Sequence, residues 1–69
     1  MTLSGTLQLS GSQWTLTDAN GKTYLLTGGN FPARANGLQV RIIGQKADDF
    51  GGGVLHGEVT VLVQQWRAL

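Results

Sequence analysis

Gly21-Lys22-Thr23 is the first stretch of the chain whose residue types could do chemistry. The same three types end the phosphate-binding loop of many nucleotide-binding proteins, where another glycine stands five residues before the second glycine of the motif. Here position 16 is Leu, and strands are expected on both sides of the stretch rather than a helix whose N-terminus could bind phosphate. We therefore interpret Gly21-Lys22-Thr23 as part of a hairpin and not as a nucleotide site.

Asp48, Asp49 and His56 form the second candidate, because carboxylates and an imidazole can hold a metal ion or transfer protons. His56 is the only histidine and the chain has no cysteine, which excludes disulfides, thiolate metal sites and cysteine nucleophiles. Catalytic groups also need a rigid supporting shell, whereas adjacent aspartates near glycines are typical of a solvated loop. The sequence accordingly predicts no catalytic residue, no metal site and no cofactor, and we do not expect an enzyme.

The 69 residues allow one domain, spanning positions 1–69. Charged residues make up only 13% and apolar ones 41%, a balance unlike that of disordered chains, and the formal net charge is +1.

The first residues, Met1-Thr2-Leu3-Ser4-Gly5, lack the basic and apolar parts of a signal peptide. No apolar run approaches the ~18 residues of a membrane helix, so we expect a cytoplasmic protein without membrane contact.

Apolar and polar residues alternate with a period of two in the first part of the chain, which predicts three strands. We expect these strands at residues 2–10, 13–17 and 22–27, with Gly5 as a bulge or bend in the first. Between the last two, Asp18-Ala19-Asn20-Gly21 is a strong hairpin signal, because Asn-Gly tolerates the positive φ angles of tight turns.

The middle of the chain interrupts this alternation. Residues 31–36 fit a short helical connector, after which alternation over residues 38–44 predicts a fourth strand. Residues 45–53 are glycine-rich at their end and predict a loop, and residues 54–66 predict a long fifth strand. Because so long a strand exceeds what a small barrel needs, we expect it to bend at Gly57.

Five strands on so short a chain must hide their edges, and closure into a barrel does so completely. We therefore expect an all-β fold: a five-stranded closed barrel with a short helical connector between strands three and four. The supporting pattern is Gly5-x-Leu7, Trp14-x-Leu16-x-Asp18, Gly21-Lys22-x-Tyr24-x-Leu26 and Gly37-x-x-Val40-x-Ile42-x-Gly44. It resembles the OB-fold and is similar to the small stand-alone bacterial OB proteins. An SH3-like small barrel is the alternative, disfavoured by the position of the connector.

The resemblance implies binding of single-stranded nucleic acid across the second and third strands, between the first hairpin loop and the loop joining strands four and five. The basic residues that could form a modest track are Lys22, Arg34, Arg41, Lys46 and Arg67. We expect Lys22, Arg41 and Lys46 to contact phosphates of single-stranded DNA or RNA. Phe50 and Trp66 would stack on bases.

The composition of the strand faces predicts that such binding is weak. Trp14 and Tyr24 share the parity of apolar neighbours, so we expect both rings to be buried. The opposite face is poor in charge and in rings, with Thr15, Thr17, Thr23, Leu25 and Thr27. A net charge of +1 also offers little counterion release. We therefore predict a non-enzymatic module with weak, sequence-tolerant binding.

Apolar residues expected on the outside of the barrel favour a different function. With the valines of the fifth strand facing inward, strict alternation turns Leu62 and Trp66 outward. A contiguous apolar patch indicates an interface. The alternative is thus a self-assembling structural or protein-interaction module, a homo-oligomer, whose interface residues are Leu25, Ile43, Leu62 and Trp66. A carbohydrate or small-molecule site on the same face is a third possibility.

Two phenylalanines are expected near the barrel ends. Phe31, just before Pro32, is the predicted plug of one end. Phe50 stands in the glycine-bearing loop, where it either inserts into a partner or against a base, or folds back as a lid over the other end.

Overall fold

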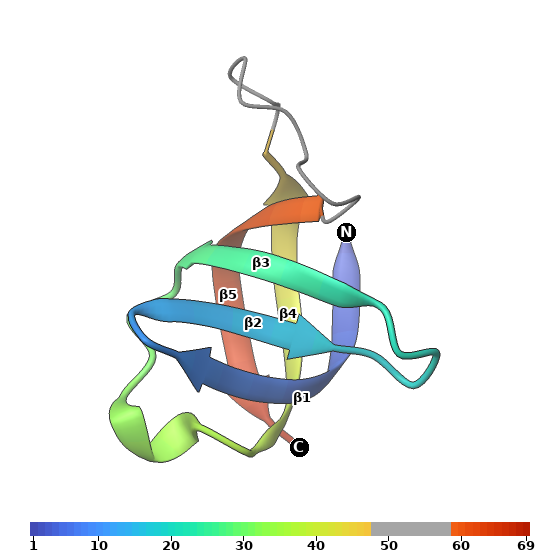
Figure 1. Ribbon diagram of the computed structural model, residues 1–69. Coiled ribbons are helices and arrows are strands. Elements are labelled where there is room, and N and C mark those ends of the chain that lie inside the picture. Colours follow the sequence, from blue (N-terminus) through green and yellow to red (C-terminus); the bar gives the residue numbers. More distant parts are fainter. Residues whose placement is uncertain (48–58) are drawn as a thin grey trace.

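The computed structural model of the chain describes residues 1–47 and 59–69. Within them lie five strands and one short 3-10 helix (Figure 1): β1 (Thr2–Ser10), β2 (Gln13–Thr17), β3 (Thr23–Gly28), η1 (Ala33–Ala35), β4 (Gln39–Lys46) and β5 (Val59–Ala68). The first two strands coincide with the predicted ones. The third is one residue later than predicted at both ends.

The five strands form one closed barrel with the order β1-β2-β3-β5-β4. Every neighbouring pair is antiparallel except β3 and β5, which run parallel. In Figure 1, β2 and β3 cross in front of β4 and β5, and the connector that carries η1 lies below them. Closure leaves none of the five strands with an open edge. The predicted all-β fold, a five-stranded closed barrel with a short helical connector, is confirmed.

Strand β1 closes the barrel by pairing with two different strands in turn. Its first half pairs with β4, as in Gly5↔Val40, and its second half pairs with β2, from Thr6↔Thr17 onward. A Cβ added at Gly5 would overlap the carbonyl oxygen of Thr17 and lie 2.9 Å from its carbonyl carbon. Glycine is therefore required at this position because the end of β2 approaches it closely. The register is continuous here, so Gly5 marks a bend rather than a bulge.

The β2–β3 hairpin forms as predicted around Asp18. The main-chain N–H of Asp18 donates to Lys22 O at 2.9 Å, and the N–H of Gly21 donates to Asp18 O at 3.0 Å. The Asp18 carboxylate accepts two further bonds through Oδ1, from the N–H groups of Asn20 and Lys22 at 2.9 and 3.0 Å. Gly21 has a φ of +81°, which explains the glycine at the end of this turn.

The barrel interior is filled by apolar side chains from all five strands and the helix. The buried residues are Leu7, Leu16, Tyr24, Leu26, Ala35, Val40, Ile42, Val61 and Val63. As predicted from parity, Tyr24 is buried, whereas Trp14 is half-buried and packs against this core. Leu38, predicted as the start of the fourth strand, instead precedes β4 and is 40% exposed.

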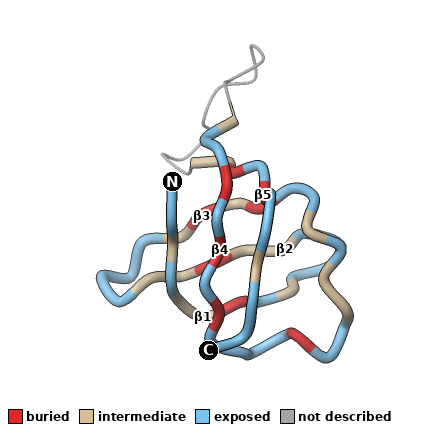
Figure 2. Tube along the Cα trace, turned by 180° about the vertical axis from the view of Figure 1, so that it is seen from behind, coloured by how far each residue is buried: buried red, intermediate tan, exposed pale blue. Residues whose placement is uncertain are grey.

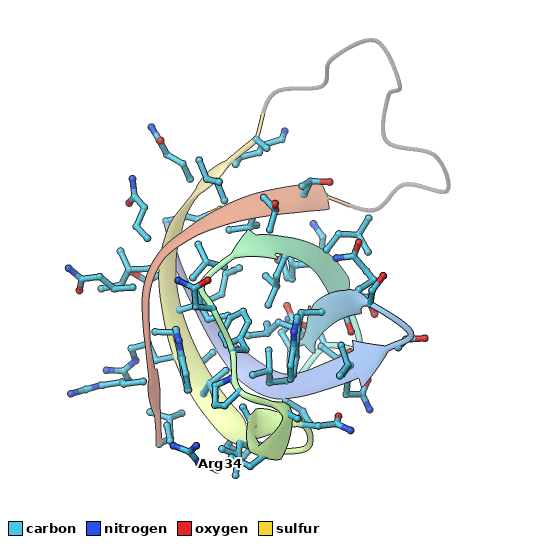
Figure 3. The ribbon with its side chains drawn as sticks, turned by 90° about the vertical axis from the view of Figure 1, so that its left-hand side faces the viewer. Arg34 is labelled. Atoms are coloured by element: carbon cyan, nitrogen blue, oxygen red, sulfur yellow. The ribbon has the colours of Figure 1, made fainter. Side chains whose placement is uncertain are left out.

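The connector crosses one end of the barrel (Figure 3), and an aromatic cluster packs against the core. Phe31 lies between Trp14 and Trp66: its ring centroid is 5.2 Å from that of Trp14 and 5.0 Å from that of Trp66. The Trp66 indole N–H donates to the carbonyl oxygen of Gly29 at 3.0 Å. Phe31 thus packs against the core, partly buried. Arg34, labelled in Figure 3, lies on η1 at the outside of this end and is exposed.

A β-bulge between β4 and β5 is the feature that the sequence pattern does not show. The register passes from Gly44↔Val63 to Ile43↔Gln65, so Gln64 is an extra residue in β5. The fourth strand does not end near Gly44 but continues to Lys46. A Cβ at Gly44 would overlap the carbonyl oxygen of Leu62, so glycine is required where β5 comes close. Residues 54–58 of the predicted fifth strand, with Gly57, lie outside the described residues.

Candidate functional site

The charged residues within the described strands are all basic and all lie on β4 and β5. They are Arg41 and Lys46 in β4 and Arg67 in β5. No Asp or Glu stands in any of the five strands as the structure describes them. The net charge of +1 therefore conceals a local excess of positive charge on one part of the barrel wall.

Arg41 and Arg67 are cross-strand partners in the antiparallel β4–β5 pair. Buried and exposed residues alternate along β4 (Figure 2), and Arg41 points outward because its neighbours Val40 and Ile42 are buried. Arg67 is also exposed and, as the cross-strand partner of Arg41, lies on the same face. Residues directly opposite one another have Cβ atoms about 5 Å apart, and like charges in such a pair repel. The outer wall thus holds two guanidinium groups side by side, with no carboxylate in the described strands around them to neutralise them.

This pair of arginines exists because of the bulge at Gln64. If the register of Gly44↔Val63 continued without a bulge, Arg41 would stand opposite Trp66, and Arg67 would stand opposite the buried Val40. The extra residue moves Arg67 outward to face Arg41. The sequence identifies Arg67 only as one of five basic residues. It does not identify Arg67 as the partner of Arg41, because a bulge cannot be located from alternation alone.

A shallow hollow of about 130 Å³ accompanies the arginine pair. It is lined by Arg41, Ile43, Gln65, Trp66 and Arg67. Guanidinium groups present several N–H donors in a planar fork that matches the oxygens of phosphate and carboxylate groups. The arrangement is therefore suited to bind an anion on the outer surface of the barrel.

A second hollow, of about 340 Å³, lies beside the first along β1. It is lined by Ser4, Gly5, Thr6, Thr17, Asp18, Ala19, Gln39 and Leu69. Ser4 is the register partner of Arg41 on the neighbouring strand, so the two hollows adjoin. Most of the side chains around this second hollow carry a hydroxyl, amide or carboxylate group. None of them is basic, whereas the first hollow is lined by two arginines.

The structure does not bring the predicted phosphate contacts together. Lys22 lies in the β2–β3 hairpin, with its Nζ 5.3 Å from the ring centroid of the buried Tyr24. Lys46 is five residues from Arg41 along β4, a distance of about 16 Å. Because this spacing is an odd number of residues, the two side chains leave opposite faces of the strand. Of the three predicted contacts, only Arg41 lies in the basic pair. Phe50, Asp48, Asp49 and His56 lie outside the described residues.

Trp66 does not face outward as strict alternation predicts. The bulge reverses the parity of β5 after Gln64, so Trp66 stands opposite the buried Ile42 and its ring packs against Phe31. Its indole is half-buried and bonded to Gly29, an arrangement that leaves little of the ring free to stack on a base or to join an outer apolar patch.

The outer wall of β2 and β3 has the composition that the sequence predicts. Its cross-strand pairs are Thr15↔Leu25 and Thr17↔Thr23, and the two threonine hydroxyls of the latter lie 3.4 Å apart. Neither strand places a charged residue or an outward-facing ring on this wall. It therefore offers hydroxyl and methyl groups, and no cation for a phosphate.

Three of the four predicted interface residues do lie on the outer wall. Ile43 and Leu62 are 42% and 45% exposed, and Leu25 is half-buried. Leu62 stands opposite Thr27 and Gln45, one diagonal step from Leu25 on β3 and from Ile43 on β4. The three side chains thus follow a diagonal across β3, β5 and β4.

No helix in the described part of the chain is both long and apolar enough to cross a membrane. Among the same residues, no group of three or more His, Cys, Asp or Glu side chains lies close enough together to hold a metal ion.

A family model described as "Protein of unknown function (DUF5818)" matches residues 4–66, a range that covers the five strands of the barrel except the first two residues of β1 and the last two of β5. Neither a curated protein nor a solved structure matches the chain.

Proposed function

The chain belongs to the DUF5818 family, and we propose that it is a non-enzymatic module that binds single-stranded nucleic acid weakly and with little sequence preference. The observation that carries this proposal is the cross-strand pair Arg41↔Arg67, exposed on a wall whose strands contain no acidic residue. Two like charges held opposite one another destabilise a sheet by several tenths of a kcal/mol. A bound phosphate removes that repulsion, so the pair is better explained by an anionic ligand than by stability.

The topology of the barrel supports the same proposal. Five strands closed in the order β1-β2-β3-β5-β4, with a short helix between β3 and β4, resemble the OB-fold. Barrels of that kind commonly bind oligonucleotides. This likeness concerns architecture, so the argument for the ligand depends on the arginines and not on the fold.

The position of the charges favours contact with the phosphate backbone over contact with bases. Trp14, Phe31 and Trp66 are packed against one another, and the β2–β3 wall carries no ring or charge within the described residues. Stacking on aromatic rings is what usually adds affinity in single-strand binding. Without it, the ligand would be held mainly by Arg41 and Arg67, which implies weak binding that is strongly sensitive to salt.

The test is a fluorescence-anisotropy titration of a labelled oligonucleotide of about ten nucleotides at several salt concentrations. Each lost phosphate contact should reduce the slope of log K against log salt by about 0.7 for a single strand. Because Arg41 and Arg67 hold one phosphate between them, the Arg41→Gln/Arg67→Gln double variant should lower that slope by about 0.7 and weaken binding at low salt. Lys22→Gln, which removes a cation from the hairpin, is the matched control. If the arginine variant and the control bind alike, the arginine pair is not the site.

A second candidate function is favoured by the diagonal of Leu25, Ile43 and Leu62. Two of these side chains are more than 40% exposed although each could be replaced by a polar residue without loss of core packing. Self-association through this diagonal would cover them. Multi-angle light scattering over a concentration series decides the matter. A particle that stays near 7.3 kDa up to millimolar concentration removes this candidate. A mass that doubles in the wild type but not in Leu62→Gln supports it.

A further inference from the structure

We propose that the hollow beside the arginine pair holds the ribose of a single-stranded RNA, and that the protein consequently prefers RNA to DNA. This inference rests on the proposed function, because Arg41 and Arg67 would hold the phosphate attached to that ribose.

The two hollows are spaced as a phosphate and its sugar require. Ser4 lines the larger hollow and is the cross-strand partner of Arg41, so its Cβ lies about 5 Å from that of the arginine. Gln39 lines the same hollow and is two residues from Arg41 along β4, about 6.6 Å. A sugar bonded to a phosphate on Arg41 and Arg67 would therefore lie within one strand spacing of this hollow.

The polar groups of the hollow are arranged to bind hydroxyls. Gln39 Nε2 donates to Thr6 Oγ1 at 2.6 Å, which fixes both side chains across β1 and β4. Since Thr6 Oγ1 accepts this bond, its own proton is free to be donated to a ligand oxygen. Ser4 adds a second hydroxyl on the same side of β1, able to donate and to accept. A 2′-hydroxyl has the same dual capacity, and it is the group by which proteins distinguish RNA from DNA.

Asp18 makes the hollow suitable for a sugar and unsuitable for a phosphate. Its carboxylate would repel a phosphate, but it can accept hydrogen bonds from sugar hydroxyls, as acidic residues do for ribose in dinucleotide sites. The N–H groups of Asn20 and Lys22 both donate to Asp18 Oδ1, so the carboxylate is held in place by the hairpin. The site therefore divides by charge: arginines at one end for the phosphate, and a carboxylate with hydroxyls at the other for the sugar.

The size of the hollow also fits a sugar. Its volume of about 340 Å³ lies at the lower end of the range for small-molecule sites and accommodates a pentose.

The experiment compares labelled oligouridylate and oligodeoxyuridylate of about ten nucleotides, which differ only at the 2′ position. Wild-type protein is expected to bind the ribo-oligomer about fivefold more tightly, the effect of one net hydrogen bond. Ser4→Ala and Asp18→Asn are expected to reduce this ratio toward one, because each removes a proposed partner of the 2′-hydroxyl. Gln8→Ala, outward on β1 but outside the hollow, should keep the ratio. Far-UV circular dichroism confirms that each variant is folded.

The outcomes separate this inference from the proposed function. Equal affinity for the two oligomers, with both weakened by Arg41→Gln/Arg67→Gln, retains the nucleic-acid proposal and overturns the ribose site. A ribo preference that survives Ser4→Ala and Asp18→Asn also overturns it, because the preference then arises elsewhere. Failure to bind either oligomer at low salt overturns both proposals.

Discussion

Replacement of Trp66 by Ala tests whether the bulge at Gln64 turns this side chain inward. In the structure the indole packs 5.0 Å from the Phe31 ring and donates to Gly29 O at 3.0 Å. Strict alternation, by contrast, places Trp66 on the outer wall, where its loss would have little effect on stability. The two positions of the same side chain therefore predict different free energies of unfolding.

The expected loss can be worked out from these contacts. Truncating a fully buried tryptophan costs about 3–5 kcal/mol, so a half-buried one should lose roughly 2 kcal/mol. The Phe31 contact and the hydrogen bond to Gly29 each add about 0.5–1.5 kcal/mol, part of which overlaps with the first figure. We expect Trp66→Ala to lose about 3 kcal/mol. Domains of this length have a total of only about 3–10 kcal/mol. Trp66→Phe keeps a ring and should lose about 1 kcal/mol.

Urea unfolding followed by far-UV circular dichroism measures these values without relying on tryptophan fluorescence. Leu62→Ala is the matched control, because Leu62 is on the same strand, is apolar and is 45% exposed. It should lose about 0.5 kcal/mol or less. If Trp66→Ala lost no more than Leu62→Ala, the indole would not be part of the core. The register beyond the bulge, and with it the Arg41↔Arg67 pair, would then be wrong.

Two further predictions concern the close approach in the barrel wall and the hairpin. Gly44→Ala should lower the free energy of unfolding by about 2 kcal/mol, because the new Cβ would overlap Leu62 O and lie 2.9 Å from a Val61 methyl carbon. This corresponds to a fall of about 10 °C in Tm. Gly11→Ala, with a φ of +63° and no atom within 4 Å, should cost only about 1 kcal/mol, and equal losses in the two would contradict the close approach. Asp18→Ala removes the acceptor of two main-chain N–H groups and should cost about 1 kcal/mol, measured by thermal denaturation. Asp18→Asn keeps a side-chain oxygen and should lose less stability than Asp18→Ala. If Asp18→Asn lost at least as much stability as Asp18→Ala, the charge of Asp18 and not its role as an acceptor would matter.

Several parts of the fold could be predicted because they depend on local physics. The alternation of Leu7 and Leu9 with polar neighbours defines β1, since successive side chains of a strand point to opposite faces. The hairpin at Asp18 and Gly21 follows from turn chemistry within a few residues. Closure of the barrel followed from the need to hide strand edges on a chain with five strands and little mass. None of these conclusions requires knowledge of which strand pairs with which.

The candidate site could not be predicted in the same way, because it depends on pairing between distant strands. Nothing in the sequence near Gln64 marks it as the extra residue, yet that residue decides which side chains of β5 face outward. Alternation therefore failed for Trp66 and could not identify Arg67 as the partner of Arg41. The predicted phosphate contacts are not neighbours for a related reason: Lys22 lies on the hairpin over Tyr24, and the side chain of Lys46 points to the opposite face of β4 from that of Arg41.

The sequence by itself thus determined the strands, the hairpin, the class of fold and the lack of charged residues on the β2–β3 wall. The tertiary structure decided where the few charges meet, because a cross-strand neighbour is set by register and not by position along the chain. One inserted residue in β5 reverses its parity. That reversal packs a tryptophan against the core and brings an arginine to the surface. It places this arginine opposite another, beside a hollow lined by hydroxyl groups.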